Sequence, residues 1–100
     1  MNRVLASLTV LGLIGVGWVH AQDSPVSRGL AATCTGCHGP AGVSSGLVPS
    51  INGMEASRMV ALLQEFRDGK REATIMHQLA KGYSDAQMQM LAQWFAAQKP

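Results

Sequence analysis

A chain of 100 residues has room for one small domain at most. Its eight Lys and Arg residues barely exceed its six Asp and Glu residues, for a formal charge of +2, and this excludes the strong basic excess that nucleic-acid-binding domains normally carry. A domain this small buries little apolar surface, so we expect it to need a disulfide, a metal or a cofactor to complete its core.

The first segment, residues 1–21, has the pattern of a secretory signal peptide. Arg3 supplies a positive start, residues 4–19 are apolar and uncharged, and small residues precede an expected cleavage point before Gln22. A retained membrane anchor is the alternative, but the apolar run is shorter than the about 20 residues that a spanning helix needs. We therefore expect residues 22–100 to be the mature chain, periplasmic and without a membrane span after signal removal.

A first helix is predicted to begin at Pro25, after Ser24. A serine hydroxyl is well suited to cap a helix, and proline at the first helical position loses no hydrogen bond. The helix would run towards Cys34, and Gly29 offers a place where the last helix of the chain is expected to pack closely. Four residues would lie near one face of this first helix: Val26, Gly29, Leu30 and Thr33.

The sequence CTGCH follows at residues 34–38. The pattern C-x-x-C-H is the signature of covalent haem attachment. Two intervening residues let one helical turn present the sulfurs of Cys34 and Cys37 on the same side, where they can add to the two vinyl groups of neighbouring pyrrole rings. His38 follows at once and offers an imidazole nitrogen to the iron. The motif predicts one covalent haem c with His38 as its proximal ligand.

Two cysteines at this spacing could have three other roles. A thioredoxin-like redox pair belongs in a βαβ setting, and the sequence predicts no strands. A structural zinc site needs four ligands, yet only two cysteines and two histidines follow residue 21. A disulfide across two residues would be strained and would leave His38 without a role. An export signal, helical surroundings and a small core all favour haem.

The rest of the chain predicts a long loop and three further helices. Residues 39–53 are rich in Gly, Pro and Ser, and a loop of this length in a compact domain is usually functional. Residues 54–68 repeat apolar side chains at helical spacing, and a shorter helix is expected over residues 74–81. The last helix begins at Ser84, whose partner Gln87 completes a capping box. The predicted fold class is all-α, with three to five short helices.

A haem iron has a second axial position, and methionine or histidine would fill it. Met54 stands at a helix start, and Met76 and His77 lie in the segment between two predicted helices, so position leaves all three as candidates. The other methionines of the mature chain fall on regular helices: Met59 and Met88 are interpreted as packing residues, and Met90 as a flexible side chain on the last helix.

The whole segment after the signal resembles a class I cytochrome c domain. Its second half is similar in particular to the haem subunit of flavocytochrome c sulfide dehydrogenase, through TIMHQLAKGYSD at residues 74–85 and LAQWFA at residues 91–96. The resemblance implies that Met76 is the second axial ligand. It also implies that the carbonyl of Pro49 accepts the N–H of the His38 ring and so fixes its orientation. Many of those subunits carry two haem domains, whereas this chain has one motif.

With His38 and Met76 both bound, the iron would have no free position for a substrate. A closed site of this kind suits outer-sphere electron transfer. The resemblance thus implies a mono-haem electron carrier without catalytic residues of its own, whose redox partner would be an FAD-containing sulfide dehydrogenase subunit. A free carrier for another respiratory chain is one alternative, and a haem enzyme or gas sensor with a displaceable Met76 is another. His77 is interpreted as a surface residue.

Overall fold

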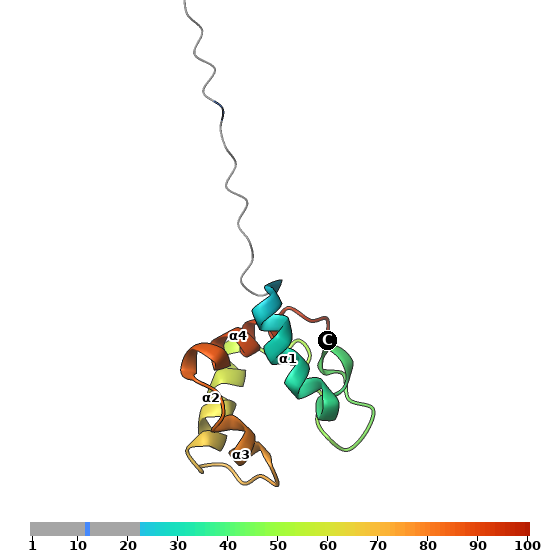
Figure 1. Ribbon diagram of the computed structural model, residues 1–100. Coiled ribbons are helices and arrows are strands. Elements are labelled where there is room, and N and C mark those ends of the chain that lie inside the picture. The colour runs from blue at the N-terminus through green and yellow to red at the C-terminus, as the bar shows by residue number, and fades with distance from the viewer. Residues whose placement is uncertain (1–11, 13–22) are drawn as a thin grey trace, which may run out of the picture.

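The computed structural model describes Gly12 and residues 23–100, so the predicted signal peptide lies outside the described residues except for Gly12. Residues 23–100 form four α-helices and one short 3-10 helix, with no strand (Figure 1). This confirms the all-α prediction. Among the described residues, no helix has the length and hydropathy to cross a membrane. The elements are α1 (Pro25–His38), η2 (Pro40–Gly42), α2 (Ala56–Arg67), α3 (Met76–Ala80) and α4 (Asp85–Ala96).

Helix α1 begins where the sequence indicates. The Ser24 hydroxyl accepts a hydrogen bond of 3.1 Å from the backbone N–H of Ser27, and Pro25 opens the first turn. This bond satisfies one of the N–H groups that a helix start leaves without a partner. The helix continues past Cys34 and ends at His38, so the whole attachment motif is helical.

The buried face of α1 differs from the predicted one. Ser27 and Ala31 are buried, whereas Val26 and Gly29 are exposed. A Cβ atom at Gly29 would meet nothing within 4 Å. The expected close crossing at Gly29 is therefore wrong, because the face that meets α4 carries the residues spaced four apart at 27 and 31.

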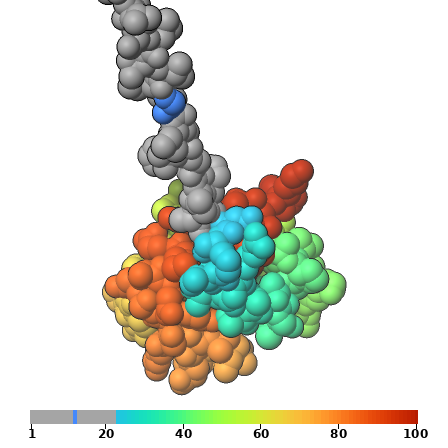
Figure 2. Space-filling view, turned by 45° about the horizontal axis from the view of Figure 1, so that its top comes forward, coloured from blue at the N-terminus to red at the C-terminus, as the bar shows by residue number. Residues whose placement is uncertain are grey.

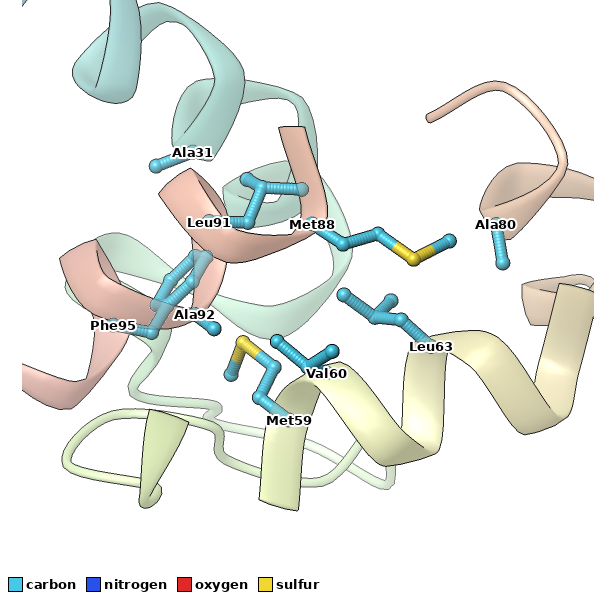
Figure 3. Close-up of a cluster of buried hydrophobic side chains, with 9 residues drawn as sticks. All are labelled: Ala31, Met59, Val60, Leu63, Ala80, Met88, Leu91, Ala92 and Phe95. Carbon is cyan, nitrogen blue, oxygen red and sulfur yellow. The ribbon is translucent and has the colours of Figure 1, made fainter. Parts of the chain in front are cut away.

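Helix α4 packs on both α1 and α2, while α3 packs on α2. Figure 3 shows how the core lies between them: Phe95 and Ala92 face Met59 of α2, and the side chain of Met88 points towards Ala80. Phe95 is the one aromatic ring among the nine buried apolar residues, so the core is small. These residues are Ala31, Met59, Val60, Leu63, Ala80, Met88, Leu91, Ala92 and Phe95.

Two helices, α2 and α3, are shorter than predicted. Helix α2 covers Ala56–Arg67 and leaves Met54 before its first turn. Helix α3 covers Met76–Ala80, so that Met76 is its first residue. The helix start predicted at Ser84 is confirmed.

A reciprocal pair of hydrogen bonds caps α4. The Ser84 hydroxyl accepts the backbone N–H of Gln87 at 3.1 Å, and the Gln87 side-chain oxygen accepts the backbone N–H of Ser84 at 3.0 Å. Two donors at the helix start are satisfied by this exchange.

Gly39 turns the chain immediately after His38. Its φ is 88°, and a Cβ atom there would lie 1.8 Å from the carbonyl oxygen of Val43. Only glycine fits this conformation at this distance. The turn ends α1 at the histidine and sends the loop back across the end of the helix.

Gly42 brings the loop to the core. It is buried, has φ 82°, and a Cβ atom there would come within 3.0 Å of the Phe95 ring. Its carbonyl oxygen accepts the N–H groups of Ile51 at 2.8 Å and Asn52 at 3.3 Å. These bonds close the loop at its base and so hold the segment that contains Pro49.

The end of α4 is tied to the same loop. The N–H of Gly53 donates to the carbonyl oxygen of Phe95 at 2.8 Å, and the Asn52 amide donates to the carbonyl oxygen of Lys99. In Figure 1 the C-terminal residues accordingly lie beside the loop that follows α1. The loop is thus held by η2 at one side and by the last helix at the other.

Candidate functional site

The last turns of α1 present both cysteines. Cys34 is half-buried and packs against the core, whereas Cys37 is exposed, and both are free thiols. Residues three apart on a helix are neighbours on its surface. The helical turn that the motif predicts is therefore present, with both sulfurs on one side of α1.

The His38 ring is oriented by the loop. Its Nδ1 lies 2.6 Å from the carbonyl oxygen of Pro49, the contact that the resemblance implies. Because a carbonyl oxygen only accepts, Nδ1 must carry the proton and donate it. In the neutral ring, Nε2 is then the nitrogen without a proton, and its lone pair is available for a metal.

The thiol of Cys34 is not tuned for redox exchange. Burial raises the pKa of the Cys34 thiol, and a hydrogen bond with Thr33 opposes this only in part. Reactive dithiols of the thioredoxin type work the opposite way, with a lowered pKa. The environment of Cys34 thus gives no support to the redox-pair alternative.

Met76 lies on a different element from the attachment motif. It is half-buried and packs against the same core cluster as Cys34, but α3 rests on α2 and not on α1. Figure 1 shows α3 well separated from the end of α1. The structure therefore brings Cys34, Cys37, His38 and Pro49 together at the end of α1, and it places Met76 on a separate helix against the same core.

Two other candidates for the second axial position remain close to the core. Met54 is half-buried against it, in the turn before α2. His77 is also half-buried, and its Nδ1 atom is buried with no hydrogen-bond partner in the described part of the chain. His77 is therefore a partly exposed residue with one ring nitrogen shielded from solvent.

Exposed apolar side chains flank these segments. Large apolar side chains left in water are unfavourable, and a group of them normally marks a binding surface. One set lies on the loop after His38, at Val43, Leu47 and Val48, with Leu47 fully exposed. A second set, Ile75 and Leu79, lies on either side of Met76 in the chain.

The donor set and these apolar surfaces fit a haem. Two thiols, an imidazole with a free nitrogen and a thioether are the groups that hold haem c, and a flat apolar macrocycle suits the exposed apolar side chains. Among the described residues no three His, Cys, Asp or Glu side chains gather as a metal site. The zinc alternative accordingly gains no support.

The contact between Tyr83 and Thr33 could not be predicted from the sequence. The hydroxyl groups of Tyr83 and Thr33 lie 2.5 Å apart, although 50 positions separate the two residues. Periodicity within one element carries no signal for a partner so distant in the chain. In Figure 2, α1 lies between the loop that follows it and the segment around α3.

Comparisons with known proteins give consistent matches. The sequence profile of a family described as cytochrome c matches residues 27–98. The chain is 39% identical over 71 residues to the cytochrome subunit of sulfide dehydrogenase from Chlorobaculum tepidum. The aligned residues make up 69% of this chain and 64% of that protein. It is 34% identical to cytochrome c4 from Pseudomonas aeruginosa, over 99% of this chain and 50% of that protein.

A third relative is the thiosulfate dehydrogenase electron acceptor of Thiomonas intermedia. It is 39% identical over 75 residues, or 71% of this chain and 34% of that protein. The chain thus spans between about a third and two thirds of the length of these three relatives.

Proposed function

Because the chain belongs to the cytochrome c family, whose domains carry covalently bound haem c, we propose that residues 22–100 form a mono-haem domain that transfers electrons. Cys34 and Cys37 hold the haem through thioether bonds, and His38 and Met76 are the axial ligands. The bound haem supplies a reversible one-electron couple at its iron. The protein supplies burial, ligand orientation and a docking surface.

The hydrogen bond from His38 Nδ1 to the Pro49 carbonyl carries this proposal. It leaves Nε2 as the free nitrogen of the ring, one residue after the second cysteine of the motif. A partner of this kind on the second nitrogen is typical of metal-bound histidine, because it fixes the tautomer and raises the basicity of the ligand. No comparable orientation would be needed for a histidine that merely ends a helix.

Ligation by Met76 favours an electron carrier over a haem enzyme. Methionine raises the reduction potential and fills the position that a substrate or gas would need. The residues adjoining Met76 in the chain are Ile75 and His77, so one titratable group stands there. A single histidine without a hydrogen-bond partner is a weak basis for acid–base catalysis.

The relatives support a redox protein as partner. One is named a cytochrome subunit of sulfide dehydrogenase and another a thiosulfate dehydrogenase electron acceptor. We propose a periplasmic location after removal of residues 1–21, and an FAD-containing sulfide dehydrogenase subunit as the partner. Purification from the native source tests this: a flavoprotein in equal amount supports a subunit, and a protein that elutes alone is a free carrier.

The axial ligand is tested by the weak red absorption band of a ferric Met–iron pair. Met76→Ala should abolish the band, lower the reduction potential and let cyanide bind. Met54→Ala and His77→Ala are the matched controls and should keep the band. Loss of the band in either control variant, together with its retention in Met76→Ala, would assign the ligand elsewhere.

A further inference from the structure

The two elements that carry the proposed axial ligands belong to different packing pairs. Helix α1, which ends at His38, packs on α4, whereas α3, which begins at Met76, packs on α2. Helix packing therefore links the two ligands indirectly, through α4 and α2. A contact that joins α1 to the α3 side would act on the distance between the two ligands.

Tyr83 and Thr33 form such a contact. Thr33 lies on α1 directly before Cys34, and Tyr83 lies between α3 and α4. The Thr33 hydroxyl donates its proton to the carbonyl oxygen of Leu30 at 2.6 Å. Since a threonine hydroxyl has one proton, Tyr83 must donate its own to Thr33 Oγ1, across 2.5 Å. The same oxygen lies 3.8 Å from the sulfur of Cys34.

Tyr83 is also firmly connected to α3. Its backbone N–H donates to the carbonyl oxygen of Ala80 at 3.3 Å, and Ala80 is the fully buried last residue of α3. The Tyr83 ring packs against the core cluster. A movement of α3 away from α1 would therefore pull directly on the Tyr83–Thr33 hydrogen bond.

We propose that the Tyr83–Thr33 hydrogen bond is a latch that limits how far the Met76 segment can move from the attachment helix and so slows the loss of Met76 from the iron. The proposal rests on the axial ligation put forward above. Tyr83 and Thr33 act as positioning residues, because they work through Met76 and Cys34 and do not themselves ligate the metal. Without the latch, α3 keeps its packing on α2, but the distance between α3 and His38 varies more widely.

The rate at which imidazole binds the ferric holoprotein tests the latch, because imidazole reaches the iron only after Met76 has left. Tyr83→Phe keeps the ring and removes the donor, and it should speed binding about fivefold, equivalent to about 1 kcal/mol. Thr33→Val should give a similar gain. Thr33→Ser restores the acceptor and should return the rate to that of the wild type.

Two further variants make the test specific. Because both substitutions break the same bond, the Tyr83→Phe/Thr33→Val double variant should bind imidazole no faster than either single variant. Ser57→Ala removes a different exposed side-chain hydrogen bond, from the Ser57 hydroxyl to Glu55, and should leave the rate unchanged.

Different results would refute the latch and the ligation by Met76 on which it depends. If the red band persists in Tyr83→Phe while the imidazole rate equals that of the wild type, the latch is refuted and ligation by Met76 stands. Additive gains in the double variant also refute the latch, as does an equal gain in Ser57→Ala. If Met76→Ala itself keeps the band, the proposed ligation is wrong and the latch falls with it.

Discussion

At the scale of single residues, the attachment motif depends on where its two sulfurs lie. Cys34 touches the core cluster and Cys37 faces outward, so a haem bonded to both would extend the core at the end of α1. The core itself is small, with Phe95 as its one aromatic ring. A covalent cofactor in this position would then contribute a large share of the buried apolar area.

This leads to a prediction for the cysteines. A Cys34→Ser/Cys37→Ser double variant should yield a protein that is largely unfolded, because metal and cofactor binding is coupled to folding in domains of this size. Mass spectrometry should show one haem on the mature wild-type chain and none on the variant, and far-UV circular dichroism should show loss of helix. Thr35→Ala lies inside the motif and should keep its haem. A stable helical double variant without haem would contradict the prediction.

The methionines show how far residue patterns reach. Helix phase predicted that Met59 and Met88 are packing residues, and both are buried. The same phase could not choose among Met54, at a predicted helix start, and Met76 and His77, in the segment between two predicted helices. The choice depends on the tertiary path of the chain, and residue patterns within one element do not encode that path.

At the scale of the elements, an ion pair joins the end of α2 to the start of α4. The Arg67 guanidinium lies 2.6 Å from the Asp85 carboxylate and 3.2 Å from that of Asp68. The hydrogen bond from Arg67 lowers the pKa of the Asp85 carboxyl below its usual value. Asp85 is also in the first turn of α4, where a negative charge favours the helix.

The lowered pKa sets the pH dependence of this contact. A carboxyl whose pKa is lower in the folded state stabilises the fold above its unfolded pKa of about 3.9, and that contribution disappears as the pH falls through the folded value. Asp85→Asn should therefore lower the thermal midpoint of the holoprotein at pH 7, and the difference from the wild type should close towards pH 2. Glu72→Gln removes a carboxylate that makes no ion pair among the described residues and should show no such dependence.

The helix ends show which helix starts the sequence could predict. The starts of α1 and α4 were predicted to the residue, because each has a serine cap whose hydrogen bond is local. Helix α3 has no side-chain cap at Ile75 and packs on α2, so no local cap signal marks where it begins. It is accordingly shorter than the predicted range of residues 74–81.

At the scale of the whole molecule, charge is distributed unevenly along the chain. Residues 29–54 contain no Asp, Glu, Lys or Arg, so the attachment motif and the loop after it carry no formal charge. Lys70 and Lys81 stand before and after α3, are exposed, and make no ion pair in the part of the chain that the structure describes. By contrast, Arg71 is paired with Glu65 at 3.0 Å.

Among the described residues around α3, the two free lysines outnumber the single free carboxylate of Glu72, and this predicts a net positive field beside α3. Ferricyanide is a small anionic oxidant, and it should oxidise the ferrous Lys70→Glu variant several-fold more slowly than the wild type at low salt. The difference should shrink as salt is added, since the screening length is about 8 Å at physiological ionic strength. Stopped-flow measurements across a salt series give the oxidation rates of both proteins. Lys99→Glu makes the same change of charge near the C-terminus, and an equal slowing there would mean that net charge alone matters.

The pairing of α1 with α4 bears on the order in which the domain acquires its structure. Ala31 and Leu91 share one core although most of the domain separates them in the chain, so a long loop must close before either helix gains its partner. Contacts of such long range slow folding and make it depend on the last part of the chain. The face of α1 that carries Ala31 thus cannot be buried while α4 is still missing, and Cys34 beside the core is then more accessible to a haem than in the folded domain.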